Sequence, residues 1–89
     1  MKVLRGIYMA PDYKKNICAN ITYLRKVHGI SRTAMCKTLH ISRKTLDLVE
    51  QGIFPRRLNF SIVYYAAEAF HTDPYHIMYT LLEETAVLD

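Results

Sequence analysis

The stretch from Ser31 to Gly52 limits the fold most strongly, because it contains two short helical patterns with almost no linker between them. Ser31 and Ser42 are both favourable N-caps, and each begins one of the two patterns. Apolar residues then recur at helical spacing, Met35 and Leu39 in the first pattern and Leu46 and Val49 in the second. Helices this short are not stable alone in water, so both must pack on other helices.

Three further helical segments supply these neighbours. The first begins after Asp12, a natural N-cap, and ends before Gly29, and another begins at the strong start signal Asp73-Pro74. A third follows Asn59, which we expect to cap it. We therefore predict an all-α domain over residues 13–85, a compact bundle of about five helices at 13–27, 32–39, 43–51, 60–70 and 74–85. Residues 1–12 are expected to form an irregular or β-like N-terminal arm, and 86–89 a tail.

Charge is distributed unevenly along the chain. Residues 14–57 hold ten Lys or Arg and only two acidic residues, whereas residues 58–89 hold five acidic residues and no Lys or Arg. The overall net charge of +4 conceals this difference. Because the basic part coincides with the two short helices, the sequence predicts a one-sided surface that binds a polyanion.

Other classes of protein find little support in these residues. No apolar run approaches the 18 or so residues that a membrane span needs, and the start of the chain lacks the apolar core of a secretory signal. Cys18 and Cys36 have neither zinc-like nor redox spacing, so we expect two reduced thiols in a cytoplasmic protein. Cys36 and His40 could supply two metal ligands, but no second pair completes a site. We expect no enzyme activity, no cofactor and no metal, because no convergent catalytic set is present.

The run from Ser31 to Gly52 resembles the helix-turn-helix of the Cro/phage-repressor (xenobiotic response element) family of transcription regulators. The family's small residue, turn glycine and final Glu-x-Gly correspond here to Cys36, His40 and Glu50-Gln51-Gly52. Cys36 is small enough for the helix crossing, and His tolerates a positive φ better than most residues. Arg32 stands where the family usually has Gln. The likeness extends over roughly residues 17–78.

The resemblance implies that helix 43–51 is a recognition helix that lies in the major groove of double-stranded DNA. Its base-reading candidates are Ser42, Arg43, Lys44, Asp47 and Leu48. Candidates for the DNA backbone are Arg32, Thr33, Lys37, Thr45, Arg56 and Arg57. Asp47 has three open roles: it could accept from a cytosine amino group, repel unwanted sequences, or pair with Arg43 four residues earlier.

Glu50 lies in the last turn of the recognition helix, where the helix dipole disfavours an anion. In proteins similar to this one, an Arg seven residues before the helix-turn-helix pairs with this Glu. Counting back from Arg32, that residue is Arg25. The resemblance therefore implies a partly buried, structural ion pair between Arg25 and Glu50.

The last helix carries an apolar stripe that is broader than one packing contact needs. Candidates for a homodimer contact on it are Tyr75, Met78, Tyr79, Leu81 and Leu82. The expected function is a sequence-specific DNA-binding regulator, a repressor that acts as a homodimer. The alternative is an antitoxin or other protein-binding module, whose C-terminal helices bind a partner protein such as a toxin or another regulator.

Overall fold

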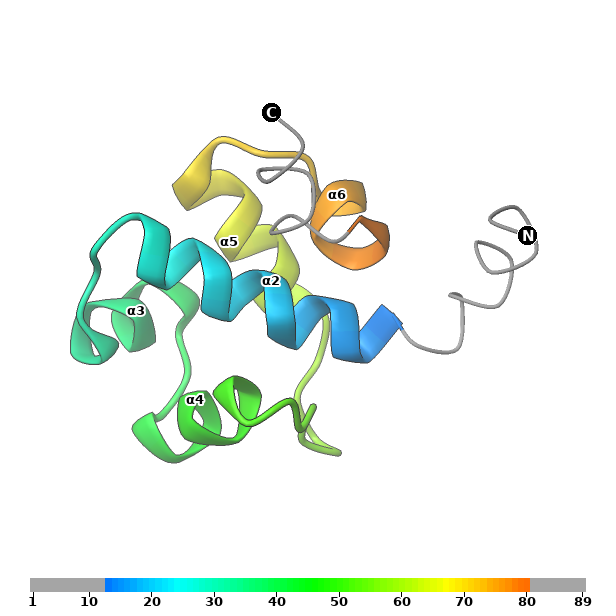
Figure 1. The fold of residues 1–89 in the computed structure, drawn as a ribbon. Coiled ribbons are helices and arrows are strands. Elements are labelled where there is room, and N and C mark those ends of the chain that lie inside the picture. The colour runs from blue at the N-terminus through cyan, green and yellow to red at the C-terminus, as the bar shows by residue number, and fades with distance from the viewer. Residues whose placement is uncertain (1–12, 81–89) are drawn as a thin grey trace.

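The structure, a computed structural model, describes residues 13–80 and contains helices but no β-strand within them (Figure 1). The helices are α2 (Tyr13–Val27), α3 (Arg32–Leu39), α4 (Arg43–Glu50), α5 (Ser61–Phe70) and α6 (Pro74–Tyr79). The predicted all-α class is thus confirmed. The expected arm at 1–12, the tail at 86–89, and the candidates Leu81 and Leu82 lie outside the described residues.

The turns around α3 and α4 have the expected chemistry. The Ser31 and Ser42 hydroxyls each accept a hydrogen bond from a backbone N–H three residues later, both at 3.1 Å. His40 ends α3 in the left-handed region with a φ of 58°, and its N–H binds carbonyls of the last turn of α3. Because His40 adopts the conformation of a turn glycine, only three residues, 40–42, separate α3 from α4.

Helix α2 lies across the middle of the molecule in Figure 1, with α5 and α6 on one side and α3 and α4 on the other. It packs directly on α4, α5 and α6, while α3 packs on α4 and α5. The buried apolar residues form one core: Ile17, Cys18, Ile21, Leu24, Met35, Leu39, Leu46, Val49, Ile62, Val63, Ala66, Ala67 and Ile77. The two short helices are thus stabilised by packing on their neighbours, as their length requires.

Two asparagines on the buried face of α2 position α6. The Asn20 side chain is completely buried, and its Nδ2 donates to the carbonyls of Ile77 at 2.7 Å and Thr80 at 2.6 Å. Asn16 Nδ2 donates to the carbonyl of Met78 at 3.3 Å. These bonds satisfy carbonyls at the C-terminal end of α6 that would otherwise lack partners in the interior.

Helix α6 is shorter than the predicted range 74–85. It ends at Tyr79, and Thr80 already has an extended backbone with φ −114° and ψ 136°. At this end of α6, Asn20 binds carbonyls of the kind that a helix end leaves without an intrahelical partner.

Two other helix ends differ by one residue from their predicted positions. Helix α4 ends at Glu50, with Gln51 as its C-cap, and α5 begins at Ser61 rather than at residue 60. Phe60 takes the N-cap position of α5 without a side-chain bond. Asn59 was expected as the cap, and its Oδ1 does accept from the N–H of Ser61 at 2.9 Å. Asn59 thus closes the turn before α5 from one position further back.

Candidate nucleic-acid interface

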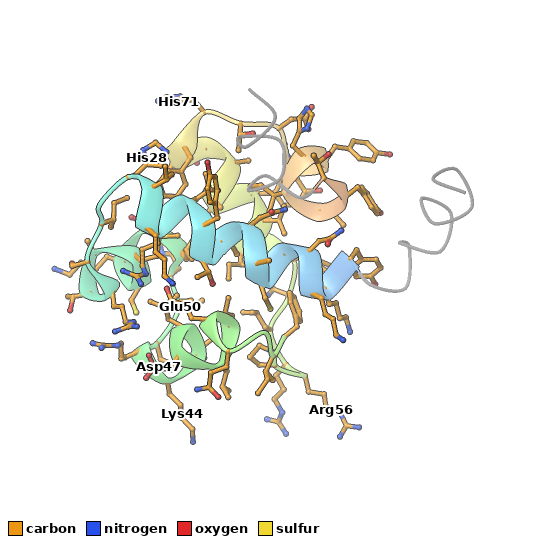
Figure 2. The ribbon with its side chains drawn as sticks, in the orientation of Figure 1. His28, Lys44, Asp47, Glu50, Arg56 and His71 are labelled. Carbon is orange, nitrogen blue, oxygen red and sulfur yellow. The ribbon has the colours of Figure 1, made fainter. Side chains whose placement is uncertain are left out.

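Helix α4 has one buried face and one open face. Leu46 and Val49 are buried in the core, whereas Arg43 and Lys44 at the N-terminal end are exposed. Figure 2 shows Lys44 extending away from the body of the molecule, on the side where Arg56 also projects. The start of α4 therefore presents cationic side chains outward from a scaffold formed by the other helices.

The structure places the candidates for base contacts around this open face. Ser42, Arg43 and Lys44 are exposed, and Asp47 and Leu48 are half-buried. The Ser42 hydroxyl also donates to Thr45 Oγ1 at 3.0 Å, so both hydroxyls belong to the cap of α4. Among the candidates for the DNA backbone, Thr45 is half-buried, and the exposed ones are Arg32, Thr33, Lys37, Arg56 and Arg57.

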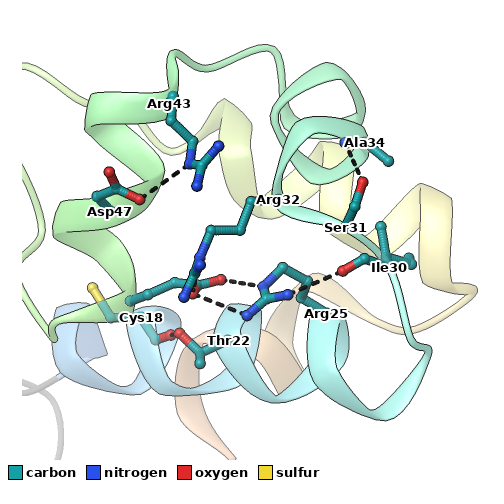
Figure 3. A network of polar contacts seen from close by, with 10 residues as sticks. Cys18, Thr22, Arg25, Ile30, Ser31, Arg32, Ala34, Arg43 and Asp47 are labelled. Atoms are coloured by element: carbon teal, nitrogen blue, oxygen red, sulfur yellow. Dashed lines mark hydrogen bonds and ion pairs between the residues drawn. The ribbon is translucent and has the colours of Figure 1, made fainter.

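The expected ion pair between Arg25 and Glu50 is present (Figure 3). Arg25 binds both carboxylate oxygens: Nε donates to Oε2, and a terminal nitrogen donates to Oε1 at 3.1 Å. The other terminal nitrogen donates to the carbonyl of Ile30 at 3.0 Å. The side chains of Arg25 and Glu50 are only 13% and 8% exposed. This bidentate pair connects the end of α2 with the end of α4.

Glu50 has a second cationic partner that the sequence did not indicate. Arg32, at the first position of α3, donates from Nε to Glu50 Oε1 at 3.2 Å, although its side chain is 47% exposed. Arg32, which stands where the family usually has Gln, was expected to contact the DNA backbone. No pattern in the sequence joins Arg32 to Glu50, because this contact depends on how α3 and α4 cross and on the conformation of the Arg32 side chain.

The two arginines keep Glu50 in its charged form. Burial raises the pKa of the Glu50 carboxyl, but the hydrogen bonds and positive charges of Arg25 and Arg32 lower it by more. The pKa of Glu50 in the folded protein therefore lies below its ordinary value of 4.5. As a consequence, the ion pair stabilises the fold fully above that ordinary value.

We expect the free energy of unfolding to decrease as the pH falls below about 4.5, because the unfolded chain then binds a proton at Glu50 more readily than the folded protein does. Urea unfolding between about pH 6 and pH 3 measures this effect when wild type is compared with Glu50→Gln. The stability advantage of wild type over the variant should stay level down to about pH 4.5 and shrink below it. An advantage that stays constant over this range would contradict the account.

Asp47 pairs with Arg43, which is one of the three roles left open for it. Arg43 Nε donates to Asp47 Oδ1 at 3.3 Å, and the two side chains are 56% and 48% exposed. Pairs of this kind on a helix surface contribute only about 0.3–0.5 kcal/mol to stability. The pair is therefore of little importance for the fold itself.

The loop after α4 is attached to the core and carries two more cations. Phe54 packs against the ring of Phe60 with centroids 5.6 Å apart, and Lys14 Nζ lies 5.6 Å from the centroid of the Phe54 ring. Arg56 and Arg57 follow in the loop and are exposed. Lys14, which no motif in the sequence indicated, thus lies beside the loop that carries these two arginines.

Exposed aromatic side chains gather on α5 and α6. Tyr64 and Tyr75 are 61% and 71% exposed, and the rings of Tyr75 and Tyr79 lie 5.3 Å apart. With Met78, these residues line one shallow hollow. We call Tyr64, Tyr75 and Tyr79 the tyrosine surface; it includes two of the residues expected at a homodimer contact.

The other chemistry considered from the sequence has no counterpart in residues 13–80. Both cysteines are free thiols, and burial raises the pKa of Cys18 to about 11. No group of three or more potential metal ligands occurs in this part of the chain. None of its helices combines the length and apolar character needed to cross a membrane.

The exposed cationic candidates thus come from α3, the start of α4 and the loop after α4, and Lys14 of α2 lies beside this loop. Helix α4 is attached to the bundle by its buried face and by the Arg25–Glu50 pair. Comparisons with models of protein families, with curated proteins and with solved structures find no match for this chain.

Proposed function

We propose that this protein is a sequence-specific regulator that binds double-stranded DNA, of the Cro/phage-repressor helix-turn-helix type, and that it acts as a repressor. The observation that carries the proposal is the geometry of α4. This helix is capped at its start and buried along Leu46 and Val49, and it leaves Arg43 and Lys44 exposed at its N-terminal end. A recognition helix needs the same combination, a fixed back and a free polar front.

The dimensions and chemistry of α4 suit the major groove. An α-helix with its side chains is about 10–12 Å wide, which matches a groove of about 12 Å. Arg43 and Lys44 carry the donors that suit O6 and N7 of guanine. Leu48 lies one turn after Lys44, and its half-exposed side chain suits the methyl group of thymine.

The surrounding cations suit the DNA backbone. Arg56 and Arg57 lie in the loop beyond the end of α4, and Lys37 is exposed on α3. Arg32 and Thr33 form the first turn of α3, where free backbone N–H groups favour a phosphate oxygen. These contacts would fix the register of α4 without reading sequence.

Two alanine variants separate the two kinds of contact. Lys44→Ala should relax the preference at one base pair by roughly 5- to 150-fold, because a contact to a base edge is lost. Arg56→Ala should weaken binding to all sequences alike, because only a phosphate contact is lost. Fluorescence anisotropy on a preferred duplex and on its single-base variants measures both. If Lys44→Ala leaves every base preference unchanged, α4 does not read DNA in this way.

Homodimerisation through the tyrosine surface is part of the proposal. Regulators of this type bind two half-sites about one DNA turn apart, roughly 34 Å, which requires two copies. Candidates for the contact are Tyr75, Met78 and Tyr79, together with Leu81 and Leu82 beyond the described residues. The strong exposure of Tyr64 and Tyr75 is equally favourable for the alternative, an antitoxin-like module that binds a partner protein there. A different small chain that co-purifies in a stable complex would favour that alternative.

A further inference from the structure

Arg32 on α3 and Arg43 on α4 are each held through Nε of the guanidinium group. Figure 3 shows the contact between Arg43 and Asp47. Arg43 uses only Nε, which donates to Asp47 Oδ1 at 3.3 Å. Arg32 likewise uses only Nε, which donates to Glu50 Oε1 at 3.2 Å. Within residues 13–80, the terminal nitrogens of these two arginines donate no hydrogen bond. Most of the donors of each guanidinium group therefore remain available.

Arg25 shows a contrasting arrangement in the same network. It uses Nε and both terminal nitrogens, on Glu50 and on the carbonyl of Ile30. Its side chain is also largely buried, at 13% exposure. Arg25 is thus satisfied within the protein, as a structural residue should be, whereas the terminal nitrogens of Arg32 and Arg43 have no hydrogen-bond partner among residues 13–80.

The carboxylates that hold these arginines belong to one side of α4. Asp47 and Glu50 are three residues apart, and Arg43 precedes Asp47 by one turn, so all three lie along neighbouring positions of the helix surface. Together with Arg32 they line an open polar hollow of about 390 Å³. Asp47 is therefore placed to fix the direction of Arg43 while the outer end of Arg43 stays open.

We propose that Asp47 is a positioning residue that determines specificity: by binding Nε of Arg43, it holds the two terminal nitrogens of Arg43 as a fork for O6 and N7 of one guanine. This inference rests on the proposed function and adds to it a role for an anion in the recognition helix. A flexible arginine must lose conformational freedom when it binds a base, and a side chain already held in the binding orientation loses less. The fork geometry also requires both nitrogens to lie in one plane with the guanine edge.

An acidic residue can be tolerated on a surface that binds DNA if it positions a neighbouring arginine. The charge of Asp47 repels phosphates, so on electrostatic grounds it lowers the affinity for every sequence. Holding Arg43 in place restores affinity only where its terminal nitrogens bind a guanine. Asp47 should therefore increase the difference between right and wrong sequences rather than the affinity itself.

The test uses the full chain and a duplex site obtained by selection. Affinities are measured for the preferred base pair read by Arg43 and for its three substitutions, in wild type, Asp47→Ala, Arg43→Ala and the double variant. We expect Asp47→Ala to reduce the guanine preference at this pair by roughly two- to tenfold and to bind the mismatched sites more tightly than wild type does. In the Arg43→Ala background, Asp47→Ala should not change the preference at this pair. Asp47→Glu, which keeps a carboxylate at i, i+4 spacing, should retain most of the preference.

Melting curves of the same proteins separate positioning from folding. Since the Arg43–Asp47 pair is exposed, Asp47→Ala and Asp47→Glu should melt within a few degrees of wild type, that is, about 2–4 °C. The proposal would be overturned if Asp47→Ala lost both the preference and much of its stability, and if Asp47→Glu were as stable as wild type but did not retain the preference.

Other results would overturn the inference and leave the proposed function intact. Equal tightening at all four base pairs would mean that Asp47 acts by repulsion alone. A change of preference at a base pair that Arg43→Ala leaves unaffected would mean that Asp47 reads a base itself.

If wild type discriminates among no duplexes at all, the proposed function fails, and the inference fails with it.

Discussion

Replacing Arg25 by alanine is expected to lower the free energy of unfolding by about 3 kcal/mol, which corresponds to a melting temperature roughly 12–24 °C lower for a domain of this size. The reason is the position of Glu50, whose side chain is only 8% exposed and depends on Arg25 for two hydrogen bonds. Thermal and urea unfolding measure the change. Lys26→Ala is a matched control, because Lys26 is the next residue, is exposed, and should cost less than about 0.5 kcal/mol.

Arg32 limits the damage in the Arg25→Ala variant, because it still reaches Glu50 at 3.2 Å. Arg32→Ala alone should cost about 1 kcal/mol or less, since its side chain is 47% exposed. The double variant leaves Glu50 without either cation, so its loss should exceed the sum of the two single losses. An Arg25→Ala protein as stable as wild type would show that the ion pair does not hold α4 on the bundle.

The affinity for DNA is expected to fall roughly a thousandfold or more when the salt concentration is raised from 50 to 200 mM, if a dimer makes about 6–10 phosphate contacts. The cations available for such contacts are concentrated before residue 58, whereas residues 58–89 hold no Lys or Arg. Anisotropy titrations of one duplex over this range give the slope of log affinity against log salt concentration.

The slope also reports how many phosphates are neutralised. A dimer should give a slope about twice that of a single copy, and Arg56→Ala should reduce it by about one unit for each copy bound. An affinity that does not respond to salt would refute the electrostatic part of the proposed binding mode. This conclusion would hold whether or not α4 contacts base edges.

Local patterns in the sequence were sufficient for most of the fold. Both serine caps, and a histidine in place of the turn glycine, define α3 and α4 without any knowledge of their neighbours. These features depend on residues that are close in sequence, which is why capping rules find them. The Arg25–Glu50 pair spans 25 positions, and only the resemblance to a known family indicated it.

Contacts with backbone groups far away in the sequence could not be predicted from local patterns. Asn20 is 57 positions from Ile77, whose carbonyl it binds, and no pattern in the sequence connects an asparagine with a carbonyl group. Helix α6 ends at Tyr79, and residues 81–85, which were expected to continue it, lie outside the described residues. In the candidate site, the second bond to Glu50 depends on the conformation of the long Arg32 side chain, which the sequence does not specify.

The most direct test of the central claim is selection of binding sites by the wild-type protein from a pool of random duplexes. If α4 reads the major groove, several rounds should enrich one shared sequence that contains guanine, and selection with Arg43→Ala or Lys44→Ala should relax the choice at one base pair of each half-site. A pool that gains no shared sequence, or the same sequence selected after both Arg43 and Lys44 are replaced, would contradict the claim.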